Sequence, residues 1–296
     1  MTHLNNSSKG VVSAILSAAF FGLIPLFTVP VLAAGMNIPN ALIYRFTFGC
    51  LAMLAILVVR RTHLHISFGD SLRIAFLSLL YVISAVTLFR GYHYMPSGIA
   101  TTLLFSYPVW TEIIMMVFFH ERLSLKIATA ILLAVGGVFL LCGFNSKEGI
   151  SSVLGIVYEM IAGLTYAIYM VAFPKMRIRK MPSLKVTFYV FFYALLFLLV
   201  YVMGTEGHIQ PITSGKVCLQ LVLLGLLPTA VSNILVIKAL KLISSTMVAI
   251  LGAFEPLTAM LVGIIAFGEP LTIPIVIGFA LIITSVVILV LKKPSK

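Results

Sequence analysis

The chain consists almost from end to end of apolar runs that are about as long as a bilayer is thick. A membrane-spanning helix needs about 20 predominantly apolar residues, and such runs follow one another from Val11 to Leu291 with short polar breaks between them. Only 9% of the residues are charged, against roughly 25% in an ordinary soluble domain. A water-soluble fold could not cover its surface with so few charges, so the sequence predicts an all-α integral membrane protein.

The polar breaks predict ten transmembrane helices, at residues 10–34, 38–59, 70–93, 98–119, 124–143, 150–173, 183–203, 217–240, 245–267 and 271–291. The first run exceeds the 7–15 apolar residues of a signal peptide and contains Pro25 and Pro30 where a cleavage site would need small residues. We therefore expect it to be retained as the first helix. Cys50, Cys142 and Cys218 show no CxxC spacing and are interpreted as small core residues.

The basic residues indicate an orientation. With the N-terminus inside, 16 of the 20 lysines and arginines fall at the inner ends of the predicted helices, and the outer ends hold Arg45, Arg90, Lys147 and Lys216. Short cytoplasmic loops carry the excess of lysine and arginine. The pattern thus predicts a plasma (inner) membrane protein with both termini in the cytoplasm, and it accounts for the net charge of +12 without a nucleic-acid partner. A basic substrate-binding surface is the alternative account.

The two halves of the chain resemble each other. A shift of 148 residues lays the segment from Arg90 to Leu141 on the second half, with Pro108 on Pro256 and Glu121 on Glu269. A shift of 141 lays Phe21–Leu23 on Ala162–Leu164. Because each half holds five predicted helices, an odd number, the second half enters the membrane from the opposite side. We predict a 5+5 inverted-topology repeat over residues 8–145 and 150–292, with cytoplasmic tails at 1–7 and 293–296.

Two motifs in the second half carry a family resemblance. Phe254–Leu257 (FEPL) and Phe267–Thr272 (FGEPLT) resemble the signature of EamA-type permeases of the drug/metabolite transporter superfamily, and Tyr107–Pro108 and His120–Ser124 take the matching places in the first half. The resemblance covers essentially the whole chain. It implies an exporter of amino acids and related metabolites, proton-coupled in some members. The family often has Glu where this chain has Tyr107, which argues against a mechanism with two symmetric carboxylates.

Four charged residues, Arg45, Glu112, Glu159 and Glu255, lie well inside predicted helices. Each would cost about 2.5–3.5 kcal/mol if it faced lipid at the bilayer centre, so all four must face protein or water. Glu255 lies midway along the ninth helix and is the candidate for proton coupling, because removal from water favours the neutral form of a carboxyl group. The alternative is a carboxylate fixed by hydrogen bonds between helices.

The repeat separates Glu112 from Glu255. The image of Glu112 under the shift of 148 is Met260, five residues past Glu255, and five residues turn a helix by about 140°. We therefore expect a structural or inter-helix role for Glu112.

Pro108 and Pro256 predict matching kinks in the fourth and ninth helices. Each proline removes the hydrogen bond to the carbonyl four residues earlier, on Leu104 and on Gly252. A freed carbonyl at membrane depth must be satisfied by protein or by a wet cavity. The kinks therefore predict a cavity or hinge, with a static packing kink as the alternative.

Polar residues on three further helices complete the candidate site. On the sixth helix, Glu159 and Tyr166 share one face, which suits an ammonium group held by charge and cation–π contact, or a packed tyrosine seam. On the eighth helix Thr229, Ser232 and Asn233 form a small polar stripe that lines a cavity or serves as close-packing glue. The predicted substrate-binding or coupling residues are Glu255, Glu159, Tyr166, Asn233, Thr229, Ser232, Tyr81, Ser84, Tyr107 and Arg45, with Pro108 and Pro256 as kink or hinge residues.

Arg45 and the small-residue pairs each allow two interpretations. Arg45 could grip a substrate carboxylate, or snorkel to the headgroups from the outer end of its helix. Gly136–Gly137 and Thr284–Ser285 correspond under the shift and predict close packing, with contact between protomers as one form of it. Nothing in the pattern specifies an oligomer.

These features favour a secondary transporter that moves a small metabolite by alternating access. That it is an exporter is implied by the family resemblance alone. An uncoupled facilitator or channel would share the architecture. An intramembrane enzyme is disfavoured, because the chain has no HExxH and no paired-aspartate motif. The chain also lacks a GxxxxGK[ST] loop, so ATP drive would need a separate partner. We expect no cofactor and no metal; the expected partners are a small-molecule substrate, the lipid bilayer and protons.

Overall fold

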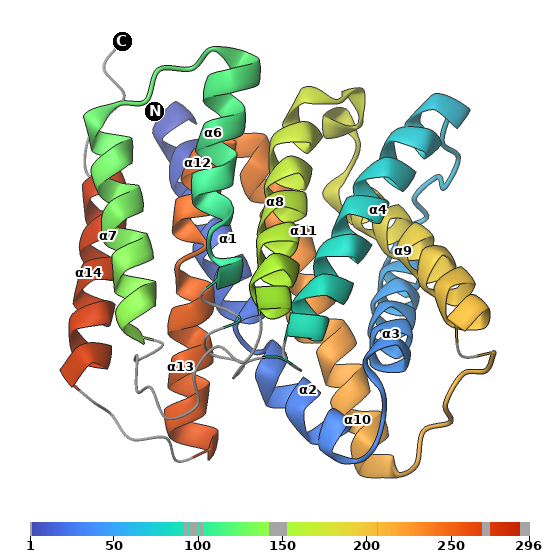
Figure 1. Cartoon of the computed structure of the whole chain (residues 1–296). Coiled ribbons are helices and arrows are strands. Elements are labelled where there is room, and N and C mark those ends of the chain that lie inside the picture. Colours follow the sequence, from blue (N-terminus) through green and yellow to red (C-terminus); the bar gives the residue numbers. More distant parts are fainter. Residues whose placement is uncertain are drawn as a thin grey trace.

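The computed structural model describes residues 2–91, 94, 100, 103–141, 153–205, 207–267 and 273–290, and these residues form helices and their connections (Figure 1). The helices of the first half are α1 (Thr2–Phe21), α2 (Ile24–Ala33), α3 (Ile38–Val59), α4 (Phe68–Gly91), α6 (Tyr107–Phe119) and α7 (Leu125–Leu141). Those of the second half are α8 (Val153–Lys175), the short η1 (Arg177–Lys180), α9 (Ser183–Thr205), α10 (Gly215–Leu224), η2 (Gly225–Val231), α11 (Ser232–Leu242), α12 (Ser245–Leu251), α13 (Phe254–Phe267) and α14 (Ile273–Val290).

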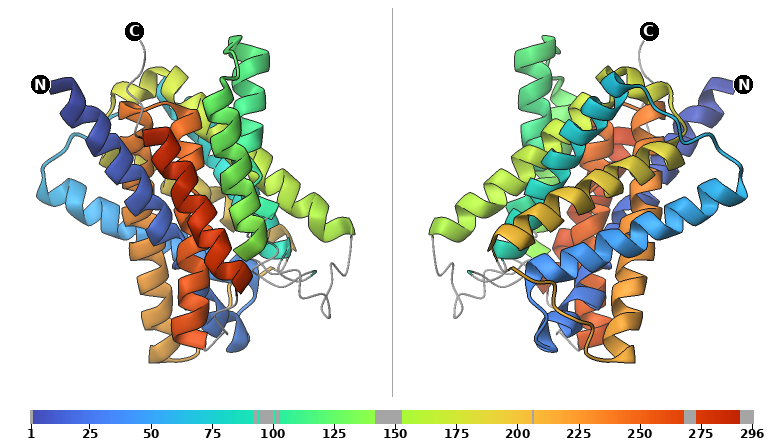
Figure 2. Two further views of the ribbon diagram at one scale, coloured as in Figure 1. Left: turned by 90° about the vertical axis from the view of Figure 1, so that its left-hand side faces the viewer. Right: turned by 90° about the vertical axis from the view of Figure 1, so that its right-hand side faces the viewer.

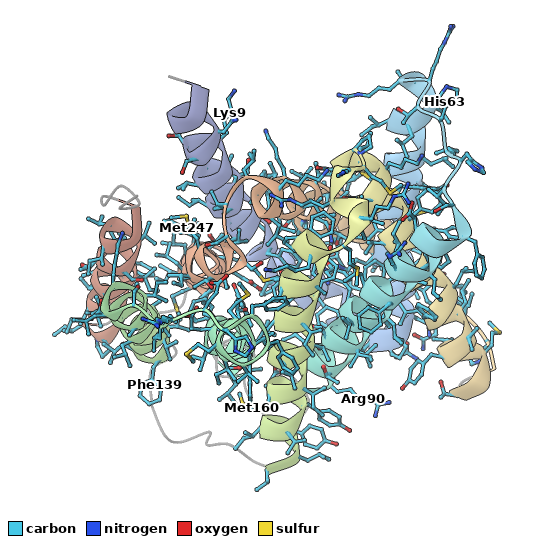
Figure 3. All side chains as sticks on the ribbon, turned by 90° about the horizontal axis from the view of Figure 1, so that it is seen from above. Lys9, His63, Arg90, Phe139, Met160 and Met247 are labelled. Atoms are coloured by element: carbon cyan, nitrogen blue, oxygen red, sulfur yellow. The ribbon has the colours of Figure 1, made fainter. Side chains whose placement is uncertain are left out.

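Seven helical runs of the described chain are long and apolar enough to cross a membrane. Three shorter apolar helices accompany them, Tyr107–Phe119, Leu125–Leu140 and Val276–Ile288. Large apolar side chains lie on the outside: Phe139 on α7 points away from the other helices (Figure 3) and is 50% exposed. An apolar exterior of this kind suits lipid as the surrounding medium.

The packing between the two halves is reciprocal. α1 packs on α11, and its counterpart in the repeat, α8, packs on α4; likewise α6 packs on α8 and α13 on α1. α3 pairs with its own counterpart α9, and α7 with α14. Figures 1 and 2 show α7 and α14 at one end of the molecule and α3, α4 and α9 at the other. Exchanging the halves therefore preserves the arrangement of helices.

Prolines mark three interruptions of the helices, and at two of them, Pro108 and Pro256, the sequence predicted a continuous helix with a kink. The first run is divided between α1 and α2 at Gly22–Leu23, and Pro25 lies in the first turn of α2. Residues 105 and 106 form a turn before α6, whose first turn contains Pro108. Gly252–Ala253 separates α12 from α13, in whose first turn Pro256 lies. Proline suits this position because an N–H there would have no helical partner.

The carbonyl that Pro256 was predicted to free has a local partner. The Gly252 carbonyl accepts a hydrogen bond from the backbone N–H of Glu255 at 2.8 Å. The Gly252 carbonyl thus finds its hydrogen-bond partner within the break itself, and this bond ties Glu255 to the turn that precedes it.

Two glycines bring the opposite halves into contact at these breaks. A Cβ on Gly22 would lie 2.4 Å from the Glu255 carbonyl oxygen, and one on Gly163 would lie 3.0 Å from the Leu104 carbonyl oxygen. Gly22 and Gly163 are the residues that the shift of 141 superimposes. Each half therefore places a glycine against the break in the other half.

The small residues of α7 and α14 pack against each other within the chain. A Cβ on Gly137 would lie 2.8 Å from the Gly278 carbonyl oxygen, and the Ser285 hydroxyl donates to the Ala130 carbonyl at 2.7 Å. The predicted close packing is therefore an intramolecular contact at these two residues.

Candidate functional site

Two hollows lie one behind the other along the axis of the bundle. The N-side hollow lies toward the end where α1 begins and the far-side hollow toward the opposite end. Each has room for about one or two water molecules. Phe21, Tyr166 and Glu255 line both. The N-side hollow is further lined by Ala14, Ser17, Tyr107, Met170 and Val248, and the far-side hollow by Arg45, Tyr81, Ser84, Ala85 and Leu104.

Glu255 lies where the two hollows meet. The break after α12 places it in the first turn of α13, and its side chain is 8% exposed. The same carboxyl group therefore faces both hollows.

Arg45 presents a positive charge to the far-side hollow. It is 2% exposed, and its Nε donates to the Thr229 hydroxyl at 2.6 Å. The guanidinium lies 5.9 Å from the Phe21 ring centroid and 5.6 Å from that of Phe46. This burial argues against snorkelling to the headgroups. Arg45 and Glu255 instead line one hollow.

The π-helical segment η2 explains how Thr229 reaches Arg45. The wider turn lets the Thr229 hydroxyl donate to the Leu224 carbonyl at 2.7 Å while it accepts from Arg45. At the start of η2, Gly225 packs on the α3 backbone, and a Cβ there would lie 2.9 Å from the Arg45 carbonyl. π segments within α-helices are frequent at functional sites. Here the segment both approaches α3 and positions its arginine.

Tyr81, Tyr169 and Asn233 form a buried polar cluster beside the far-side hollow. The two tyrosine rings lie 5.7 Å apart, and the Asn233 amide lies near both hydroxyls. Among the described residues, neither hydroxyl nor either amide atom has a partner in hydrogen-bonding geometry. Buried polar groups are nearly always bonded. The Asn233 amide is within reach of both tyrosine hydroxyls, so a small rotation of these side chains lets the three groups bond to one another.

Two of the predicted serines join helices. Ser232 and Ser17 each donate from the hydroxyl to the other's carbonyl at 2.8 Å, which ties α11 to α1. The Ser84 hydroxyl donates to the Ala162 carbonyl at 3.0 Å and also lines the far-side hollow. Ser232 thus has the packing role of small polar residues between membrane helices, whereas Ser84 combines both roles.

The acids Glu159 and Glu112 lie away from the hollows. Glu159 is fully buried against Gly91, and its carboxylate oxygens have no hydrogen-bond partner among the described residues. It is not among the residues lining the two hollows, unlike Tyr166 two turns along α8. Glu112 accepts a hydrogen bond from the Thr246 hydroxyl at 2.9 Å, joining α6 to α12, which agrees with the structural role expected for it.

Tyr107 takes the place that Glu255 has in the second half, but it packs differently. A Cβ on Gly252 would lie 1.7 Å from the Tyr107 hydroxyl oxygen, so the tyrosine occupies the space that this glycine leaves open. Its ring also meets Tyr166 edge-on, with centroids 5.1 Å apart. Tyr107 thus reaches from the first-half break to the second-half break.

Phe21 lines both hollows but was not among the residues predicted from the sequence. The available signal was Gly22 followed by Pro25, a combination that ends one helix and begins another. Among the described residues, no group of three or more His, Cys, Asp or Glu side chains could hold a metal ion.

Comparison with known proteins identifies the family. The model of the EamA-like transporter family matches residues 8–143 and again residues 153–291. The chain belongs to the EamA-like transporter family. This EamA-family chain is accordingly a multi-pass membrane protein and a transporter of small substrates.

A solved structure shares the fold of this EamA-family chain. It is described as "Crystal structure of protein", is 17% identical, and covers 96% of this chain and 97% of its own, with a TM-score of 0.81. No curated protein matches the chain.

Proposed function

We propose that this EamA-family protein is a secondary transporter that works by alternating access, with ten spans arranged as two inverted halves of five. The reciprocal packing of the halves and the two family matches support the inverted repeat. The observation that carries the proposal is that one acid, Glu255, lines hollows on both sides of the middle of the bundle. In alternating access, a central site opens to each side in turn.

Glu255 is the proposed coupling residue. Protonation removes its charge and so changes the pairing with a cationic substrate group or with Arg45, which shares the far-side hollow. A proton and a cationic group then compete for one carboxylate. Such competition converts a proton gradient into substrate movement in the opposite direction, which is export when the outside is the more acidic.

The proposed substrate is a small molecule that carries a cationic group and polar or anionic groups. The acid of Glu255 and the aromatic face of Tyr166 suit an ammonium group, and Arg45 suits a carboxylate. Amino acids, amines and amphipathic drugs fit this description. The proposed location is the plasma membrane with both termini in the cytoplasm, supported by the distribution of basic residues.

A thermal-shift screen tests the binding part of this proposal. The purified protein is heated with amino acids, amines, vitamins and nucleosides, and a true ligand raises the melting temperature by mass action. We expect an amine or amino acid to stabilise the wild type and to lose that effect in the Glu255→Gln variant. Ligands that stabilise both proteins equally would place binding elsewhere.

An uncoupled facilitator is the second candidate, because it would use the same hollows. Counterflow of the labelled ligand in proteoliposomes, with and without a pH gradient, separates the two. A coupled transporter accumulates the ligand only when the gradient is present. A facilitator exchanges it at the same rate in both conditions.

A further inference from the structure

Phe21 lies between the two hollows. It is the last residue of α1, next to the Gly22–Leu23 break, and lines both hollows together with Tyr166 and Glu255. The Phe21 and Tyr166 rings meet edge-on, with centroids 6.3 Å apart and planes at 60°. One ring comes from each half, so their contact crosses the interface between the halves.

The aromatic barrier continues to a third helix. Tyr166 on α8 meets Tyr107 on α6 with centroids 5.1 Å apart and planes at 89°. Rings from α1, α8 and α6 therefore form a row across the middle of the bundle. Each edge-to-face contact is individually weak, so the row can separate during a conformational change.

The break after Phe21 gives its side chain a place to move. At this break the Gly22 N–H donates to the Ala18 carbonyl at 2.9 Å and the Leu23 N–H donates to the Phe20 carbonyl at 3.1 Å. Gly22 also packs directly on the Glu255 carbonyl. A rotation at this break therefore shifts Phe21 and acts on the backbone that carries Glu255.

Phe21 also contacts the charge in the far-side hollow. The Arg45 guanidinium lies 5.9 Å from the Phe21 ring centroid, within the range of a cation–π contact. An anionic group that binds Arg45 competes with the ring for the same cation. Ligand binding and the position of Phe21 are thus linked through the Arg45 side chain.

We propose that Phe21, with Tyr166, forms the central gate of the transport path. Its ring separates the two hollows, and its displacement at the Gly22–Leu23 break switches access to Glu255 from one side to the other. This inference rests on the proposed function and adds to it the residue that keeps the two sides apart.

Cysteine accessibility tests the gate without any substrate. In a background with Cys50→Ala, Cys142→Ala and Cys218→Ala, a single Ala14→Cys reports on the N-side hollow and a single Ala85→Cys on the far-side hollow. A membrane-impermeant methanethiosulfonate is added from the far side of oriented proteoliposomes. We expect Ala85→Cys to react rapidly and Ala14→Cys slowly. Adding Phe21→Ala should raise the rate at Ala14→Cys by about tenfold or more, which needs a barrier only modestly lower.

Phe27→Ala is the matched control. Phe27 belongs to the same span, is partly buried against the core and is not among the lining residues of either hollow. It should leave both rates unchanged, and Phe21→Leu, which keeps most of the bulk, should keep the Ala14→Cys rate low. If Phe21→Ala does not fold, Tyr166→Ala provides the same test from the other ring.

The outcomes distinguish the gate from the transport proposal. An unchanged Ala14→Cys rate in Phe21→Ala, with normal labelling at Ala85→Cys, overturns the gate. The same holds if Phe27→Ala raises the rate as much as Phe21→Ala does. Because labelling needs no transport, gated labelling without counterflow of the ligand from the thermal-shift screen keeps the gate and refutes the proposed alternating-access transport of that ligand.

Discussion

The break before α6 and the break before α13 occupy corresponding places in the two halves and share their construction. Each has a turn, a proline in the first turn of the following helix, and a glycine of the opposite half packed against it. They differ in the residue before the proline. Glu255 faces both hollows, whereas Tyr107 fills the space above Gly252.

This difference separates the role of the interrupted helix from the role of the acidic side chain. Both halves keep an interrupted helix, which supplies the flexible centre that alternating access requires. Only the second half places an acid there, and only that acid shares its hollow with a buried arginine. We infer that the first-half break serves packing and movement, and that the second-half break serves binding and coupling.

Substitution of the glycines at the two breaks should have the largest effect on stability. A Cβ on Gly22 would meet the Glu255 carbonyl oxygen at 2.4 Å and the Thr258 Cβ at 2.6 Å. On Gly163, the nearest atom would be the Ser106 hydroxyl at 2.7 Å, which can rotate away. We expect Gly22→Ala to destabilise the fold by about 3 kcal/mol and Gly163→Ala by about 1 kcal/mol.

Melting temperatures of the purified variants in detergent check this order. Gly136→Ala is the control, because a Cβ there would meet nothing within 4 Å, and it should leave the melting temperature unchanged. A Gly163→Ala variant less stable than Gly22→Ala would contradict the assignment of the tighter contact to the second-half break.

Loss of the hydrogen bond that positions Arg45 should have the next largest effect on stability. Thr229→Val keeps the shape of the side chain but removes the acceptor of the Arg45 Nε hydrogen bond. Loss of a hydrogen bond to a charged group costs about 1.5–3 kcal/mol, and ligand affinity should fall because the guanidinium loses one of its supports. Thr229→Ser retains the hydroxyl and should behave like the wild type in thermal-shift titrations. Equal losses in both variants would show that the methyl group, not the hydrogen bond, is important.

The contact of Tyr107 with Gly252 predicts a coupled pair. Gly252→Ala would place a methyl 1.7 Å from the Tyr107 hydroxyl oxygen, and we expect a loss of about 1–2 kcal/mol as the ring is displaced. Tyr107→Phe removes that oxygen and should recover part of the loss in the double variant, a departure from additivity typical of residues in contact. Additive changes in the melting temperature would mean that Tyr107 leaves this space when the protein is in detergent.

Substitution of Glu112 should have the smallest effect on stability and so tests whether Glu112 differs in role from Glu255. Glu112→Gln keeps an oxygen that can accept from Thr246, so stability should change by less than about 1 kcal/mol. Counterflow should continue, because Glu112 is not among the residues that line the hollows. Loss of counterflow in Glu112→Gln with a normal melting temperature would assign coupling to the first half as well.

In the described parts of the chain, the apolar runs predicted the helical segments within a few residues, because the bilayer imposes their length. The exception is α1, which begins at Thr2 although the predicted helix begins at residue 10 after a tail at 1–7. The same runs did not reveal the breaks. A proline removes one hydrogen bond whether the helix kinks or restarts, and the outcome at Pro108 and Pro256 depends on the helix packed beside it. The apolar runs did not reveal the π segment at Gly225–Val231 either, since its wide turn depends on close packing against α3.

The candidate site was predictable in part. Its position inside a predicted helix made Glu255 the leading acid, helical periodicity placed Tyr166 toward the interior, and both residues line the two hollows. Periodicity also grouped Glu159 with Tyr166, but a shared face says nothing of depth, and Glu159 lies against Gly91 instead. For Arg45, the choice between headgroup and interior depended on Thr229, 184 residues away in the sequence.

Accumulation of the ligand against its gradient tests the central claim, that Glu255 alone couples protons to transport. Proteoliposomes with an imposed pH gradient are loaded with a labelled ligand from the thermal-shift screen, and wild type, Glu255→Gln and Glu112→Gln are compared. We predict that wild type and Glu112→Gln accumulate the ligand, while Glu255→Gln only equilibrates it. Gradient-driven accumulation by Glu255→Gln at the wild-type level would contradict the account.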